Sequence, residues 1–238
     1  MNWGIPKAHG LRPGLGSLRA ETPTGRLRLE SCRRTNSAAS SEYPSREAGG
    51  TPKLFRGLRA LQHRGQESAG IATTSHGVLH LRKGMGLVHE IFTEELVDAL
   101  RGTTGIGHTR YSTTGTSDLE NAQPLVVKVR GEDAAIAHNG DLVNFERIRR
   151  RLQAQGVELM GSADSETMAQ MIAIEYGRTR DLEPAIRRAC AELVGGYAVV
   201  LIVGNRIAAF RDPLGIRPLV LGSLEGGWRS RASRSPSS

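Results

Sequence analysis

A block of three consecutive helix-like segments lies between groups of strand-like segments, and this order restricts the folds open to the chain. Apolar residues recur at helical spacing in three successive ranges: 145–155, 165–176 and 181–193. Strand-like alternation flanks this block in the following ranges: 69–74, 78–81, 105–111, 124–129, 134–137, 197–203 and 207–211. Two shorter helices are expected at 54–61 and 94–100. Antiparallel strand groups separated from a helix block are typical of a layered α+β fold.

The two ends of the chain lack this periodicity and are rich in Gly, Pro, Ser and Arg. Such segments bury too little apolar surface to offset the entropy lost on ordering. We therefore expect a disordered basic tail at 1–53, one folded domain at 54–225 and a disordered Arg/Ser tail at 226–238. No apolar run reaches the length of a membrane span, so no membrane partner is expected.

The formal net charge of +8 raises the possibility of nucleic-acid binding. The excess lies at the ends, with nine Lys/Arg against four acids in 1–53 and three Arg without an acid in 227–238. These segments account for the whole excess, so the patterned region between them is balanced. This distribution argues against a folded nucleic-acid surface and leaves a basic-tail nucleic-acid binder as an alternative.

The two cysteines, Cys32 and Cys190, show no disulfide or metal-binding spacing. We expect a reducing, cytoplasmic location and no metal in this chain. The histidines at 63, 108 and 138 are too scattered in sequence to predict a metal site.

Polar motifs follow the ends of several predicted strands, where a sheet holds binding residues rigidly. They occupy five ranges: 61–70 (LQHRGQESAG), 105–115 (GIGHTRYSTTG), 135–144 (AIAHNGDLVN), 161–166 (GSADSE) and 210–219 (FRDPLGIRPL). Together they resemble the glutamine-hydrolysing domain of amidophosphoribosyltransferases, a class II glutamine amidotransferase domain. The resemblance implies an N-terminal-nucleophile hydrolase fold, a four-layer αββα sandwich. It also implies a role in purine synthesis, in which ammonia from glutamine and phosphoribosyl diphosphate form 5-phosphoribosylamine.

Glutamine recognition needs partners for both charged ends of the amino acid. Arg110 suits the α-carboxylate, because a guanidinium binds it through two parallel hydrogen bonds. The alternative is that Arg110 forms a surface salt bridge without a role in binding. Asp164 suits the α-ammonium, and its alternative is capping of the helix that begins near Ser165.

Hydrolysis also needs donors for the oxyanion that forms during attack. Asn139 and Gly140 suit this role through an amide side chain and an unobstructed backbone N–H. Their alternative is a simple Asn-Gly hairpin turn. Arg64 lies in the loop that lines the glutamine pocket in the family, with loop hydrogen bonding as its alternative.

The family begins its mature chain with a nucleophilic cysteine, followed by glycine and a short apolar strand. No segment here matches that pattern. Cys32 is followed by two arginines, and Cys190 falls in a predicted helix. We therefore expect the nucleophile strand to be missing and the chain to be inactive, with a non-catalytic glutamine-binding remnant as an alternative.

The resemblance further implies a homo-oligomeric enzyme with a phosphoribosyltransferase domain. That domain uses Mg²⁺, and some family members carry an iron–sulfur cluster. The family-like sequence ends near Gly222, so we expect these groups to belong to a part that this chain lacks.

Overall fold

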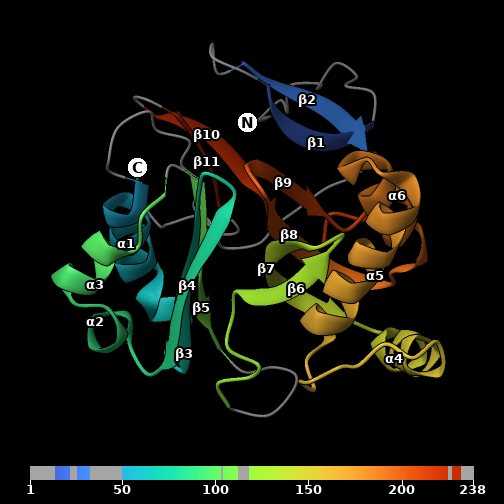
Figure 1. Ribbon diagram of the computed structural model, residues 1–238, viewed down its shortest axis with the longest axis horizontal. Coiled ribbons are helices and arrows are strands. Elements are labelled where there is room, and N and C mark those ends of the chain that lie inside the picture. Colours follow the sequence, from blue (N-terminus) through green and yellow to red (C-terminus); the bar gives the residue numbers. More distant parts are fainter. Residues whose placement is uncertain are drawn as a thin grey trace, which may run out of the picture.

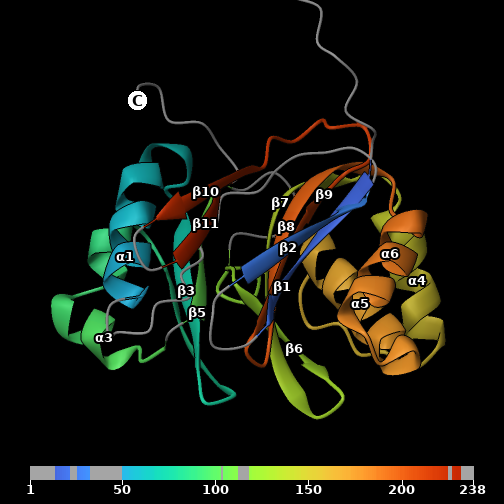
Figure 2. The ribbon, with the colours of Figure 1, turned by 90° about the horizontal axis from the view of Figure 1, so that it is seen from above.

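The computed structural model describes residues 14–21, 26–32, 50–102, 104–111, 118–224 and 227–231. Its main body has four layers, with helices, a sheet, a second sheet and helices following one another (Figures 1 and 2). This is the αββα arrangement that the sequence motifs predicted. Within the described residues, no helix combines the length and apolar character needed to cross a lipid bilayer.

The first sheet has three antiparallel strands, with β3 (Ser68–Ser75) between β4 (Val78–Met85) and β5 (Thr104–Arg110). The β3–β4 turn is tight because His76 and Gly77 both have positive φ, as a two-residue hairpin requires. Three helices cover its outer face: α1 (Gly50–Leu61), α2 (Val88–Ile91) and α3 (Glu94–Ala99). Leu54 and Leu58, one turn apart on α1, pack with Ile71 of β3.

The second sheet has four antiparallel strands in sequence order: β6 (Leu125–Val129), β7 (Glu132–Leu142), β8 (Gly195–Val203) and β9 (Arg206–Arg211). Its outer face carries α4 (Phe145–Ala154), α5 (Asp164–Thr179) and α6 (Leu182–Glu192). Ile148 and Leu152 of α4 share the core cluster with Met168 of α5. The apolar face that the sequence predicts for the 145–155 helix is therefore the face that is buried.

Small and β-branched side chains fill the space between the sheets. Both sheets contribute to one buried cluster: Ala72, Ile106, Ala135, Ala137, Val200, Ile202, Ile207 and Ala209. Four of these eight residues are alanines, so this layer packs the two sheets together with little side-chain bulk.

The terminal segments differ from the sequence-based expectation of disordered tails. Strand β1 (Gly14–Glu21) pairs with β2 (Arg26–Cys32), where Arg and Leu alternate over 26–29 as in a strand. Strand β10 (Val220–Leu224), at the end of the expected domain, pairs with β11 (Gly227–Arg231), which lies inside the expected C-terminal tail.

The start of the folded domain also differs, since α1 begins at Gly50 rather than after residue 53. Thr51 explains the extension, because its buried hydroxyl donates to the Leu100 carbonyl over 2.5 Å. The remaining tail predictions, for 1–13, 22–25, 33–49 and 232–238, lie outside the described residues.

Candidate functional site

A cavity of about 380 Å³ lies where β5, β7 and the first turn of α5 come together. Its lining includes all five residues that the sequence singled out: Arg64, Arg110, Asn139, Gly140 and Asp164. Arg110 belongs to the first sheet and Asn139 and Gly140 to the second, whereas Arg64 and Asp164 lie in helical segments, and the five residues span a hundred positions of sequence. The fold therefore gathers the predicted site residues around one cavity.

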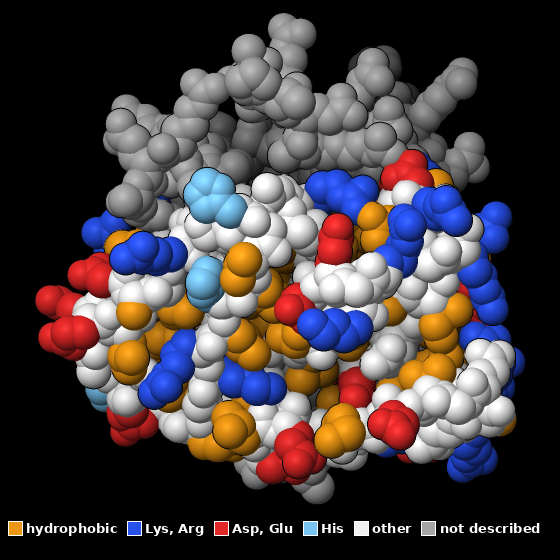
Figure 3. All heavy atoms as spheres, viewed as in Figure 1, with side chains coloured by type: hydrophobic (Ala, Val, Ile, Leu, Met, Phe, Trp, Pro, Cys, Tyr) orange, Lys and Arg blue, Asp and Glu red, His pale blue; other side chains and the backbone are white. Residues whose placement is uncertain are grey.

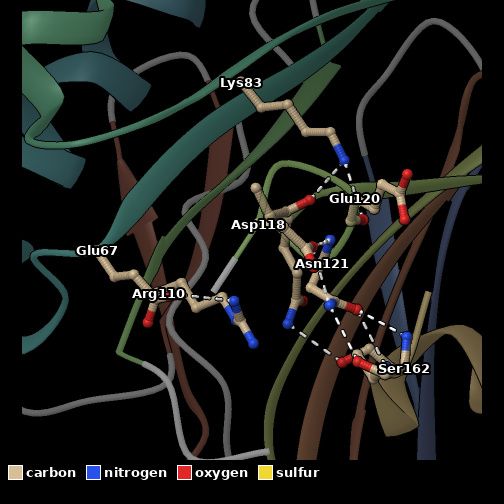
Figure 4. Close-up of polar contacts among 11 residues, drawn as sticks. Glu67, Lys83, Arg110, Asp118, Glu120, Asn121 and Ser162 are labelled. Carbon is tan, nitrogen blue, oxygen red and sulfur yellow. Dashed lines mark hydrogen bonds and ion pairs between the residues drawn. The ribbon is translucent and has the colours of Figure 1, made fainter. Parts of the chain in front are cut away.

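Arg110 ends β5 and is 95% buried, with a relative exposure of 5%. Its Nη1 donates to Glu67 Oε1 over 2.7 Å (Figure 4), and Glu67 N donates to the Arg110 carbonyl over 3.1 Å. The alternative of a surface salt bridge is therefore wrong, because the pair is largely withdrawn from water. Sequence reasoning missed Glu67, although the β3–β5 pairing that sets Ser68 opposite Arg110 also brings Glu67 to this strand end.

Arg64 ends the short 3₁₀ helix η1 (Gln62–Arg64), which follows α1. The next residue, Gly65, lies so close to β5 that a Cβ there would meet the Thr109 carbonyl carbon at 2.5 Å. Gln62 holds the turn from both ends of its amide: Oε1 accepts from Val88 N over 2.5 Å, and Nε2 donates to the Gly65 carbonyl. Close backbone approach and this double contact fix the loop that presents Arg64 to the cavity.

Asp164 is the first residue of α5, and the N-cap is Ala163, which has no capping side chain. The alternative that Asp164 caps the helix is therefore wrong. Its Oδ2 accepts from Leu142 N over 2.9 Å, and its Oδ1 lies 3.5 Å from His138 Nδ1. Burial is the largest single influence and would raise the pKa of Asp164, but His138 and the backbone N–H groups of Leu142 and Ser165 together hold it below its ordinary value. The site therefore contains a buried carboxylate in its charged form.

Asn139 and Gly140 lie inside β7, opposite Ala198 and Tyr197 of β8. The alternative of an Asn-Gly hairpin turn is therefore wrong. Gly140 has φ +145°, and a Cβ at this position would lie 2.0 Å from the Gly196 carbonyl oxygen. Only glycine fits here, so no side chain at this position can obstruct the part of the cavity that Gly140 lines.

Two histidines, His108 and His138, also line the cavity. Burial lowers the pKa of His108 to about 3, and electrostatic interactions with His138 and Arg110 act in the same direction. His108 is therefore neutral at physiological pH. His138 Nδ1 lies 3.0 Å from Ser165 Oγ, so its ring is fixed against the first turn of α5.

Gln123 ties these groups together and was not predicted from the sequence. Its Oε1 accepts from His138 N over 2.6 Å, and its Nε2 donates to Ser165 Oγ over 3.2 Å. Gln123 is buried in the loop that precedes β6, where no periodicity in the sequence marks it. One amide therefore joins β7 to α5 at the wall of the cavity.

Arg217 brings a third guanidinium to the lining, and it too was missed. Its Nη2 donates to Asp141 Oδ2 over 3.3 Å. The buried carboxylate of Asp212 accepts from the backbone N–H groups of Ile216 and Arg217 over 2.9 and 3.0 Å. The side chain of Asp212, in the Asp-Pro motif after β9, thus fixes the backbone of the loop that carries Arg217.

No thiol lies among the described residues that line the cavity. Cys190 is buried in α6 within the cluster between the helices and the second sheet. Cys32 is the last residue of β2. Across the described part of the chain, no group of three or more His, Cys, Asp and Glu side chains is arranged to hold a metal ion.

Comparison with known proteins gives a consistent result. The profile of the glutamine amidotransferase domain family matches residues 108–235. The amidophosphoribosyltransferase of Methanocaldococcus jannaschii is 46% identical over 173 residues, which is 73% of this chain and 37% of that protein. The chloroplastic amidophosphoribosyltransferase 1 of Arabidopsis thaliana is 42% identical over 196 residues, covering 78% of this chain and 34% of that protein.

A solved structure agrees in fold. The glutamine phosphoribosylpyrophosphate amidotransferase from B. subtilis, complexed with ADP and GMP, superimposes with a TM-score of 0.74 at 32% identity. The match covers 82% of this chain and 41% of that chain. The present sequence therefore corresponds to well under half of the length of the relatives it matches.

Proposed function

Because the chain belongs to the glutamine amidotransferase domain family, in the branch formed by the amidophosphoribosyltransferases, we propose that its cavity binds glutamine. Arg110 receives the α-carboxylate and Asp164 the α-ammonium. The side-chain amide of the ligand then points toward Asn139 and Gly140. This is the role of the domain that the family assignment and the cavity lining both support.

One observation carries this proposal: a buried guanidinium and a buried, charged carboxylate line the same cavity. A free α-amino acid carries both complementary charges on one carbon atom. Burying two separate charges is costly unless each finds a partner. Glu67 and His138 already hold the two charges in place, and a zwitterionic ligand complements both of them at once, which an uncharged or singly charged ligand does not.

The rest of the lining suits the other end of glutamine. The Asn139 side-chain amide and the Gly140 N–H are donors, and donors fixed in advance stabilise a developing oxyanion. We assign Arg64 to the rim of the cavity, where its exposed guanidinium adds positive potential near the ligand carboxylate. Neither role requires movement of the strands.

Catalysis is a separate question from binding. In class II glutamine amidotransferases, hydrolysis of glutamine begins with attack by a cysteine thiol. No cysteine is present among the described residues that line the cavity. We propose that this chain holds glutamine without hydrolysing it. The oxyanion donors then act as contacts to the ligand amide rather than as catalytic groups.

Two measurements on the purified chain test this proposal. Calorimetry with glutamine should give saturable binding, and the Asp164→Asn variant should lose most of it. An ammonia-release assay at saturating glutamine should stay at the blank. Absence of any glutamine binding would refute the assignment of the cavity, whereas turnover above the blank would refute only the proposed lack of hydrolysis.

The activity of the relatives concerns a longer protein. We propose that in such a protein this domain supplies ammonia from glutamine to phosphoribosyl diphosphate, as the names of the relatives indicate. The acceptor would then be bound by another part of the enzyme. Calorimetry should therefore show no competition between phosphoribosyl diphosphate and glutamine on this chain, and competition would contradict the division of roles.

The basic-tail alternative has less support. On the face shown in Figure 3, Lys and Arg side chains are interspersed with Asp and Glu. Nucleic-acid binding would have to depend on the basic excess of the terminal segments. To favour this function, nucleic-acid binding would have to fall steeply with added salt. Deletion of residues 1–49 would also have to abolish that binding.

A further inference from the structure

The buried side chain of Asn121 joins the loop before β6 to the segment that leads into α5 (Figure 4). Its Nδ2 donates to Asp118 Oδ1 over 3.0 Å and to Ser162 Oγ over 3.1 Å. Its Oδ1 accepts from Ser162 N and Ala163 N, both over 3.1 Å. The amide is thus used at both ends, across more than forty positions of sequence.

The segment that Asn121 holds comes directly before Asp164, and four successive N–H groups of this segment are bound by side chains. Glu166 accepts from Met160 N over 2.7 Å and from Gly161 N over 2.8 Å. Asn121 accepts the next two, from Ser162 and Ala163. Ala163, the N-cap residue of α5, makes no side-chain capping hydrogen bond, and Asn121 binds the backbone N–H of this residue from a distant loop.

Tight packing leaves this contact little freedom. A Cβ on Gly161 would lie 2.7 Å from Asn121 Oδ1, so the loop passes close to the amide. Asn121 is itself anchored, because its backbone N donates to Asp118 Oδ1 over 2.9 Å. From β4, Lys83 Nζ donates to the Ala122 carbonyl over 2.7 Å, which holds the same loop against the first sheet.

Asp164 therefore receives its position from two sources. Leu142 N and His138 contact its carboxylate directly, whereas Asn121 fixes the backbone from which that carboxylate projects. We propose that Asn121 is a positioning residue for the α-ammonium of the ligand. It acts through Ser162 and Ala163, and the inference rests on the proposed binding of glutamine.

This role differs from general structural support in what it affects. A residue that merely stabilises the fold would influence every ligand of the cavity equally. A residue that aims Asp164 affects only ligands with an α-ammonium group. The deaminated analogue 4-carbamoylbutanoate keeps the carboxylate and side-chain amide of glutamine and lacks that ammonium, so it separates the two roles.

The experiment compares the affinities of the folded chain for these two ligands. In Asn121→Ala, glutamine should bind about tenfold more weakly, which is within the usual coupling of neighbouring groups, whereas the affinity for 4-carbamoylbutanoate should stay within about twofold of the parent value. In an Asp164→Asn background, adding Asn121→Ala should weaken glutamine no further, because the group being positioned is already lost.

A matched control and a rescue variant complete the test. Asn144 also uses both ends of its amide, with Nδ2 donating to the Glu192 carbonyl over 2.8 Å and Oδ1 accepting from Val194 N over 3.0 Å, but it does not line the cavity. Asn144→Ala should leave the ratio of the two affinities unchanged. The exchange Asp118→Asn with Asn121→Asp keeps an acceptor for Ser162 and Ala163, and should restore most of the selectivity.

The possible results separate the positioning role of Asn121 from the proposed binding of glutamine. Equal weakening of both ligands in Asn121→Ala, or no change in either, overturns the positioning role while leaving the glutamine site intact. Failure of the parent chain to bind glutamine overturns the proposed function instead. Should Asn121→Ala fail to fold, Asn121→Ser keeps one acceptor oxygen and carries the same comparison.

Discussion

Arg110 donates from Nη1 to Glu67 Oε1 over 2.7 Å, and the backbone N of Glu67 donates back to the Arg110 carbonyl. Side-chain and main-chain contacts thus join the same two residues, one at the end of β5 and the other just before β3. The guanidinium is held in one orientation before any ligand arrives. Preorganisation of this kind reduces the entropy that binding must overcome.

Removal of the Glu67 carboxylate should be destabilising, because it takes the opposite charge away from the buried Arg110 guanidinium. We expect Glu67→Ala to lower the free energy of unfolding by about 3 kcal/mol, measured by urea denaturation. The exposed pair Lys128–Asp133, also 2.7 Å apart, provides the control. Asp133→Ala should change stability by less than about 1 kcal/mol, and equal effects of the two substitutions would contradict the importance of burial.

Arg110→Lys keeps the charge and loses the planar pair of donors. Glutamine should bind roughly ten- to hundredfold more weakly, corresponding to the loss of about 1.5–3 kcal/mol from a charged hydrogen bond. Calorimetry with glutamine α-amide, in which the carboxylate is replaced, should show a much smaller change. A similar loss for both ligands would mean that Arg110 does not contact the carboxylate.

Gly140→Ala should be among the most damaging single changes in the second sheet. The added Cβ would lie 2.0 Å from the Gly196 oxygen at φ +145°, so both strain and overlap oppose folding. We expect a loss of about 3 kcal/mol or more in thermal or urea unfolding. Gly131 also has positive φ, at +84°, but nothing lies within 4 Å of its Cβ position. Gly131→Ala should therefore lose only about 1 kcal/mol, and comparable losses at both sites would argue against the close strand approach.

Buried His108 should make the protein acid-sensitive. Its pKa is lowered from 6.5 to about 3 in the folded chain, so between these values the unfolded chain binds a proton that the folded chain does not. Stability therefore falls as pH falls through this window, by about 2 kcal/mol between pH 7 and pH 5.

The His108→Gln variant removes the titrating group from both states. Urea denaturation at pH 7 and pH 5 should show a smaller loss for this variant than for the parent chain. Parallel losses would assign the acid sensitivity to other groups. The comparison is made without ligand, because His108 lines the cavity.

Local patterns were sufficient to predict most of the elements. The Leu54–Leu58–Leu61 spacing and the turns at Gly77, Gly131 and Gly204 correctly indicated α1 and three hairpins. Helix α2 was missed because Val88–Ile91 is a single turn, too short to show a period. Strand β11 was missed because its residues, GWRSR, resemble the Arg/Ser tail that follows them.

The members of the candidate site were easier to predict than the contacts that hold them. Arg110 and Asp164 stand in family-like motifs, and the structure places both at one cavity. The residues that hold them, Glu67 and Asn121, could be identified only from the three-dimensional structure. Asn121 meets Ser162 across 41 positions, and no local preference for helix, strand or turn carries that information.

The alanines between the sheets have a consequence for ligand binding. Arg110 belongs to the first sheet, whereas Asp164 is attached through Leu142 to the second, so the spacing of the layers sets the distance between the two charges. Bulkier residues at Ala135 or Ala137 would spread that distance without touching a ligand. The grip on the α-carboxylate and α-ammonium of a ligand thus depends on the interior as well as on the residues that contact the ligand.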